Sequence, residues 1–183
     1  MYMPMDGTTE TMGFGTKNKL LLGKDVLKLT MELFRMNAFS DMTMEMLETG
    51  RKMYLINLGD IESYNAGLYA GYFTQISESF LLKLNGRVDY ITRSVNSEFA
   101  RATAESYWGD NYSNNNLQLN TSANLQMDIS NHESANITLS RVERAPTHLE
   151  SFGFYIYNIA DNSIYIGNPN LNKEKSYSVN LGY

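Results

Sequence analysis

Methionine is the residue with the clearest capacity for chemistry in this sequence, because 11 of the 183 residues are Met. One run, MYMPMD, supplies Met1, Met3 and Met5, and a second, DMTMEM, supplies Met42, Met44 and Met46. In an extended segment, side chains two residues apart lie on the same side of the chain. Three thioethers on one side form a soft ligand set that suits Cu(I). The sequence therefore predicts a metal site that uses Met3, Met5, Met42, Met44 and Met46.

Packing is the alternative interpretation of the same methionines. Methionine is a flexible filler of apolar surfaces, and a packing role requires no metal. The two histidines do not decide between the interpretations. We expect His132 in a short turn at the end of the sheet opposite the methionines, and His148 in a long loop, where a single histidine is usually solvated.

Motifs for enzyme chemistry are missing from the sequence. It contains no His-Glu-x-x-His, no Gly-x-Ser-x-Gly and no glycine loop that would hold a phosphate. We therefore predict no enzymatic activity and no cofactor. The net charge of −5 argues against a nucleic-acid partner, and the absence of cysteine excludes disulfides and thiolate metal sites.

Alternation of apolar and polar residues is the strongest structural signal, and it is longest in NLQLNTSANLQMDIS, residues 116–130. Such alternation is typical of a β-strand with one apolar and one polar face. Shorter stretches of alternation predict further strands in 26–38, 81–90 and 176–183, and the candidates 8–22, 61–74 and 135–145 bring the count to about seven. In 26–38 the parity changes after Leu33, which predicts a bulge. An amphipathic helix is the alternative for that segment, because Val26, Leu29, Leu33 and Met36 also fit helical spacing.

The connections between these strands alternate in length. Short connections are expected at 23–25, 75–79 and 131–134, and long polar ones at 41–59, 94–115 and 146–172. Short turns at one end and long loops at the other are typical of an outer-membrane barrel. We therefore predict an all-β, antiparallel up-and-down meander that forms part of a transmembrane β-barrel.

The partner of the apolar faces separates two fold classes. In a barrel they contact lipid and the polar faces line a wet interior, whereas in a soluble β-sandwich they contact a second sheet. Tyrosines near predicted strand ends, at 90, 112 and 183, favour the membrane. The sequence has no apolar run of about 18 residues, so we expect no transmembrane helix, and the N-terminus lacks the features of a signal peptide.

Two elements near the C-terminus carry a resemblance to a known family. The first is SRVERAPTHLE, with Arg141, Arg144, Pro146 and Glu150, and the second is GNPNLNKEKS, with Gly167, Asn168, Pro169, Leu171 and Glu174. In this order and spacing they resemble the C-terminal barrel of TonB-dependent outer-membrane receptors. Lys173 is a departure, since the family often has proline before the glutamate.

The residues of these two elements also have a direct physical interpretation. Pro146 cannot donate a hydrogen bond to a strand partner, so it is expected to end a strand. Asn168 and Pro169 predict the start of a turn. Arg144 could pair with Glu150 or Glu174 at the rim of the sheet, and we favour a structural role for the motif over substrate contact.

The resemblance implies that residues 1–183 form one partial receptor barrel. The family has barrels of about 22 strands around a plug domain, and no plug can be placed in this sequence. The implied function is energy-coupled import of a scarce nutrient across the outer membrane of a Gram-negative bacterium. Ferric siderophores and copper are the leading substrates, and TonB, outer-membrane lipid and the imported substrate are the implied partners. A passive porin and a soluble secreted β-sandwich that binds ligand are the alternatives.

Overall fold

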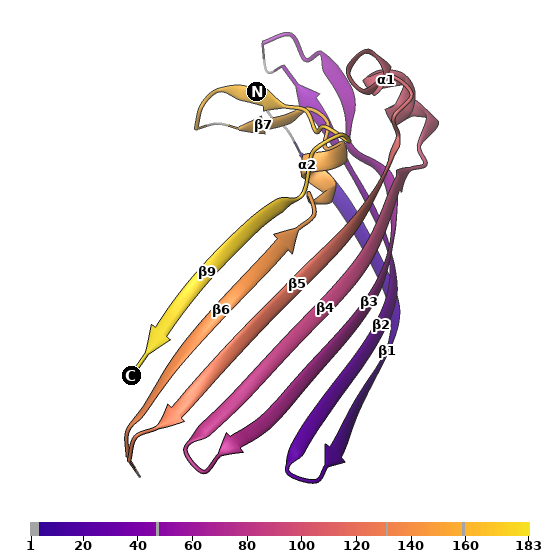
Figure 1. Cartoon of the computed structure of the whole chain (residues 1–183). Helices are drawn as coiled ribbons and strands as arrows, with labels where there is room; N and C mark the ends of the chain where they lie inside the picture. Colours follow the sequence, from indigo (N-terminus) through magenta and orange to yellow (C-terminus); the bar gives the residue numbers. More distant parts are fainter. Residues whose placement is uncertain (1–3, 47, 131, 159) are drawn as a thin grey trace.

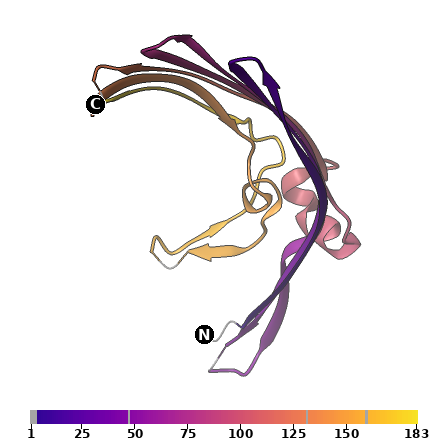
Figure 2. The ribbon, with the colours of Figure 1, turned by 90° about the horizontal axis from the view of Figure 1, so that it is seen from below.

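The computed structural model describes residues 4–46, 48–130, 132–158 and 160–183. A single antiparallel sheet of seven strands dominates it, in the order β1-β2-β3-β4-β5-β6-β9 (Figure 1). The strands are β1 (Met5–Leu22), β2 (Asp25–Glu45), β3 (Lys52–Ser77), β4 (Phe80–Val95), β5 (Ser113–Asp128), β6 (Ser134–Arg144) and β9 (Glu174–Gly182). The sheet curves without closing (Figure 2). The predicted partial barrel is therefore confirmed, and residues 26–38 form a strand rather than a helix.

The concave face of the sheet is polar. It carries alternate residues of each strand, including Lys83, Arg87 and Asp89 of β4 and the amide-rich set of β5 that begins the predicted alternation. Arg87 lies at its centre and pairs with Asp89 at 2.7 Å and with Glu32 of β2 at 2.8 Å. The pair with Glu32 joins β4 to β2, and charged groups on this face are expected for the wall of a hydrated channel.

The convex face is apolar and exposed. Leu68 of β3 and Leu117 of β5 are each 57% exposed, and Leu139 of β6 is 52% exposed. A β-sandwich would have buried these leucines under a second sheet. Their exposure contradicts the soluble-sandwich alternative and fits a surface that contacts hydrocarbon.

Tyrosines mark the two edges of the apolar convex face. Tyr64 and Tyr72 of β3 both point to this face and are eight residues apart in the sequence. At about 3.4 Å per residue and a tilt of about 40°, this spacing spans about 20 Å of depth, close to the 25 Å apolar band of outer-membrane barrels. Tyr90 and Tyr177 lie on the same face. Tyr112 does not join them, because its hydroxyl donates to the carbonyl of Arg101 and its ring packs beside the core.

The connections confirm the predicted asymmetry but correct two details. The segment 41–59 is not a loop, because β2 runs to Glu45 and β3 begins at Lys52, with a short turn between them. The bulge is not at Leu33: the pairing of β2 with β3 is regular there and shifts between Ala38, Ser40 and Asp41. The apolar residues after Leu33 instead face the concave side, where Phe34 is exposed and Ala38 is buried.

The long connections contain structure. The segment 94–115 holds α1 (Glu98–Trp108), and 146–172 holds α2 (His148–Phe152) and a hairpin of β7 (Ile156–Asn158) and β8 (Ser163–Tyr165). Figure 2 shows α2 and the β7–β8 hairpin on the concave side of the sheet. A small apolar core joins these elements to the sheet, formed by Ile56, Ile61, Val95, Ala100, Ala104, Trp108, Phe152 and Phe154. None of the helices in the described residues is long and apolar enough to cross a membrane.

Candidate functional site

The methionines of β2 and β3 lie on the concave face at the end of the sheet that carries the helices. Met42 and Met44 are two residues apart on β2 and therefore share a face. Register places Met5 of β1 opposite Met42 and Met53 of β3 opposite Met44. The sheet thus brings methionines from three strands into one row.

A cavity of about 550 Å³ lies over this row. Its walls are Met42, Met44 and Met53 from the sheet, and Tyr155, Tyr157, Asn162 and Ile164 from the segment containing the β7–β8 hairpin. Met42 is only 4% exposed, so its thioether lies inside the structure rather than on its surface. We name this space the methionine pocket. It is largely apolar, and methionine thioethers are its soft donor groups.

The outcome for the predicted metal residues is mixed. Met42 and Met44 line the methionine pocket, whereas Met46 lines a smaller adjoining cavity of about 300 Å³ with Met44 and Met53. Met5 extends the row but is 61% exposed. Met3 lies outside the described residues. Among those that are described, no cluster of His, Asp or Glu suited to a metal ion occurs.

Met53 is a pocket residue that sequence reasoning missed. It stands alone in the sequence, without a methionine two residues away. Only the pairing of β2 with β3 places it opposite Met44. If the alternation around Met42 and Met44 had been taken as part of a strand, a hairpin with a partner strand after it would have been predicted in place of the loop.

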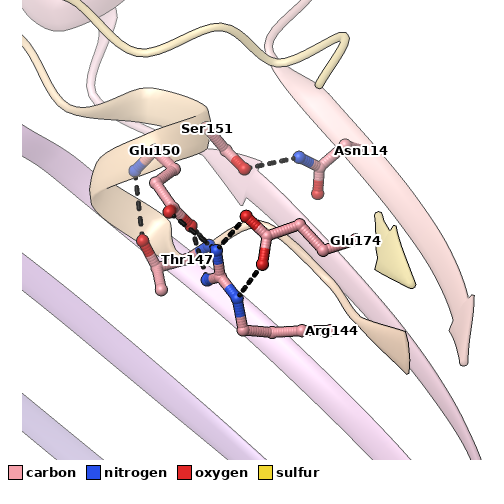
Figure 3. Close-up of polar contacts among 6 residues, drawn as sticks. All are labelled: Asn114, Arg144, Thr147, Glu150, Ser151 and Glu174. Carbon is pink, nitrogen blue, oxygen red and sulfur yellow. Dashed lines mark hydrogen bonds and ion pairs between the residues drawn. The ribbon is translucent and has the colours of Figure 1, made fainter. Parts of the chain in front are cut away.

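A second polar cluster lies where β6 passes into α2. Arg144, the last residue of β6, donates two hydrogen bonds to Glu150 at 2.8 and 2.9 Å. The same guanidinium pairs with Glu174, the first residue of β9, at 2.9 Å (Figure 3). The predicted pairing at the rim is therefore confirmed, with both carboxylates engaged. We name Arg144, Glu150 and Glu174 the rim cluster.

Local capping fixes α2 in this place. Thr147 accepts from the Glu150 amide, and the Glu150 carboxylate accepts from the Thr147 amide, which together form a capping box. Ser151 of α2 accepts a 3.0 Å hydrogen bond from Asn114 of β5 (Figure 3). Pro146 is buried directly before this cap, and β6 ends two residues earlier, as predicted.

Gly167 holds the second motif element against both helices. Its amide donates to the carbonyl of Gly153, and its carbonyl accepts from Trp108 Nε1 at 2.8 Å. Asn168 donates its amide to the carbonyl of Glu150 and accepts from the amide of Leu171, which closes the predicted turn around the buried Pro169. The motif thus ties the end of α2 to the start of β9.

Side chains replace backbone pairing between the upper parts of β5 and β6. The regular ladder ends at Thr121 and Arg141. Beyond it, the buried carboxylate of Glu143 accepts from the amide of Leu119 at 2.8 Å and from Lys173 at 2.6 Å. Lys173 also donates to the carbonyl of Leu117. The residue that departs from the family pattern therefore satisfies backbone groups where the two strands separate.

Two groups in α2 have shifted pKa values with separate causes. Hydrogen bonding to Arg144 lowers the pKa of Glu150 to about 2. Burial, with a smaller contribution from nearby Arg93, lowers the pKa of His148 to about 4. The expectation that His148 is solvated in a long loop was therefore wrong, because this residue is half-buried in α2.

We expect α2 to loosen in two steps as the pH falls. The unfolded segment takes up a proton on His148 near its ordinary pKa of 6.5 whereas the folded segment resists protonation to about 4, so stability is lost between these values. Glu150 adds a second loss between its ordinary value of 4.5 and about 2. Hydrogen exchange of residues 147–171, with exchange times corrected for pH, measures both steps.

Substitutions of His148 and Glu150 show which residue causes each of the two losses of stability. His148→Gln should remove the loss between pH 6.5 and 4 and leave the lower step intact. Glu150→Gln should remove the lower step only. If protection of α2 were constant from pH 7 to 3 in the native receptor, neither group would be coupled to its folding.

Comparison with known proteins places the chain in a family. The family model described as TonB dependent receptor-like, beta-barrel, matches residues 6–183. The chain belongs to the TonB-dependent receptor family. Receptors of this family are transporters and not enzymes, which agrees with the prediction of no enzymatic activity, and their barrels lie in the outer membrane of Gram-negative bacteria. Comparison with curated proteins finds no match.

A solved structure with a similar fold is described as a copper transporter, OprC. It superposes with a TM-score of 0.72 at 14% sequence identity, and the match covers 99% of this chain. The chain spans 27% of the length of that structure. At this identity the likeness concerns the fold, which agrees with a sheet that forms part of a TonB-dependent receptor barrel.

Proposed function

We propose that this chain forms part of the wall of an outer-membrane receptor that imports a soft metal ion, with Cu(I) as the substrate. The observation that carries this proposal is the methionine pocket, which gathers three thioethers beneath the β7–β8 hairpin. Thioethers favour Cu(I) over hard cations, whose preferred ligands are oxygen atoms. Met42, Met44 and Met53 share the lumen-facing side of the sheet, where their thioethers can meet an imported ion.

The position of the pocket supports capture from outside the cell. The pocket lies on the concave face, at the end of the sheet where α1, α2 and the hairpin gather (Figure 1). Long connections mark the extracellular end of outer-membrane barrels. A metal ion bound there would stand at the entrance of the polar lumen. Passage through that lumen is proposed to be driven by TonB acting on a plug domain, as in other receptors of the family.

The similarity to OprC agrees with this proposal, but the methionine pocket is the observation on which the proposal rests. That protein is described as a copper transporter, and its likeness to the present chain is one of fold. Ferric siderophores are the alternative substrate class. The pocket favours copper because ferric iron is a hard cation that prefers oxygen ligands.

Replacing the pocket thioethers tests the copper proposal. In the complete receptor, the triple variant Met42→Leu, Met44→Leu, Met53→Leu should weaken Cu(I) binding at least about tenfold, because each substitution removes a soft ligand while retaining apolar volume. Competition with a chromophoric Cu(I) chelator measures the affinity.

The matched control replaces three methionines on the convex face, Met12, Met31 and Met127, which are all exposed. This control should bind Cu(I) as the native receptor does. Unchanged binding in the pocket variant, or an equal loss in the control, would remove copper from the proposal. Retained uptake of a ferric siderophore by the pocket variant, together with unchanged Cu(I) binding, would favour the siderophore class.

A further inference from the structure

A depression on the convex face is not explained by nutrient import. It has a volume of about 620 Å³ and lies across β4, β5, β6 and β9. Its lining includes the small side chains of Thr121 and Ala123 and the larger apolar side chains of Leu84, Leu139 and Val179. Gly86 is the strand partner of Thr121, and a Cβ atom added there would meet no other atom within 4 Å. We name this depression the outer groove.

One end of the outer groove is cationic. Arg141 and Tyr177 line it there and face each other as strand partners on β6 and β9. Lys175 follows on the same face of β9, opposite Glu143. Lys173 reaches the same carboxylate. Arg141 and Lys173 thus both pair with the buried Glu143 carboxylate, and Lys175 is the strand partner of that residue. These three cations outnumber the one glutamate beside an apolar groove.

The depth of these charges places them at a lipid headgroup. Tyr177 is the fourth residue of β9, which starts beside α2 at the end of the sheet that carries the helices, and Val179 and Leu181 continue from it along the apolar part of β9. Aromatic girdles of outer-membrane barrels lie at the membrane–water interface. Basic side chains at that level attract anionic headgroups. The apolar groove below them has the surroundings of an acyl chain.

An amide-lined cavity adjoins the cationic end. It measures about 410 Å³ and lies between residues 114–117 of β5 and residues 169–173. Asn115, Asn170 and Asn172 are among the residues that line it. Planar amides donate and accept hydrogen bonds, so they suit the hydroxyl groups of a sugar.

We propose that the outer groove binds a phosphorylated glycolipid of the extracellular leaflet. An acyl chain lies over Thr121 and Ala123, a phosphate meets Arg141 and Lys175, and sugar hydroxyls reach the asparagine-lined cavity. This proposal rests on the membrane location proposed above, but it does not depend on which nutrient is imported.

Lipid binding to the complete receptor in detergent tests this assignment. Native mass spectrometry would titrate bis-phosphorylated lipid A and its dephosphorylated form against the native receptor and the double variant Arg141→Gln, Lys175→Gln. The double variant should bind the phosphorylated lipid about 10–30-fold more weakly, at about fivefold for each charge removed. It should no longer distinguish the phosphorylated from the dephosphorylated form.

Two matched pairs of variants separate the charge from the groove. Arg35→Gln removes another exposed cation, which pairs with Glu62 on the convex face far along the sheet, and should leave lipid binding unchanged. Gly86→Leu fills the groove and should weaken both lipid forms, whereas Ala66→Leu enlarges an exposed residue of β3 on the same face and should weaken neither.

Several results would overturn the assignment. They are unchanged binding in the double variant, an equal loss in Arg35→Gln, or displacement of the lipid by equimolar inorganic phosphate. Heat-modifiable migration on gels shows whether each receptor sample is a folded barrel. If the native receptor is a folded barrel but binds lipid A no better than the double variant does, only the proposal of lipid binding in the outer groove is contradicted. If the receptor stays soluble and monomeric without detergent, the membrane location is contradicted as well.

Discussion

Leu68→Arg should lower the free energy of unfolding of the complete receptor in lipid vesicles by about 2–4 kcal/mol, the cost of an arginine on the lipid face near the bilayer midplane. Leu68 lies on the convex face of β3, midway in sequence between Tyr64 and Tyr72, and is 57% exposed. Its neighbours across the strands are Met31 and Val88, and neither offers a counter-charge. The arginine therefore has to distort the bilayer or reach for its surface.

The matched control places an arginine on the concave face. Gln118→Arg lies opposite Asp89 of β4, so the new cation faces water and a carboxylate, and its cost should be close to zero. Asn120 is a poorer control, because its side-chain oxygen accepts the amide of Glu143 at 2.7 Å. Urea titration of both variants, followed by tryptophan fluorescence, measures the difference. Equal costs at residues 68 and 118 would contradict lipid on one face and water on the other.

The sheet was predictable because a strand period of two leaves a direct trace in the sequence. Each of the seven strands carries that trace, and the predicted strand centres all lie inside observed strands. The strand ends were less predictable. In residues 41–45 the apolar side chains, Met42 and Met44, lie on the concave face and not on the lipid-facing side. This part was therefore predicted as a loop, although β2 runs to Glu45 and β3 begins at Lys52.

The sequence contains a helical pattern for α1 that a search for strand alternation does not detect. Ala100, Ala104 and Trp108 are each four residues apart, and all three are buried against the sheet. Ser97 precedes them and caps the first turn by accepting from the amide of Ala100. A search for helical spacing inside the long polar connection would have found it.

The methionine pocket shows where prediction from sequence stops. Met42 and Met44 were visible as an alternating pair, but Met53, Tyr155 and Tyr157 join them only through strand register and the fold of a hairpin about 100 residues away. Contacts between segments so distant along the chain depend on tertiary structure. The rim cluster was predictable because its residues belong to a spaced motif with opposite charges.

Gly167→Val should detach the motif from α2 and lower the free energy of unfolding by about 1–3 kcal/mol or more, the range for forced overpacking. A Cβ atom at residue 167 would lie 2.7 Å from the backbone nitrogens of Gly153 and Phe152, and 2.8 Å from the carbonyl carbon of Ser151. Backbone atoms of a capped helix cannot move aside as a flexible side chain can. The valine therefore has to push residues 167–171 away from α2, which breaks the hydrogen bond from Trp108 to the Gly167 carbonyl.

The effect should appear as local loosening before global unfolding. Hydrogen exchange of α2 and the β7–β8 hairpin should accelerate in Gly167→Val, while the amides of β3 and β4 in the apolar band keep their protection. Gly86→Ala is the control, since its added methyl group meets no atom within 4 Å. Because the hairpin also forms one wall of the methionine pocket, the same variant should weaken Cu(I) binding although no thioether has changed. Native exchange rates in α2 of Gly167→Val would show that the motif does not hold the helix in place.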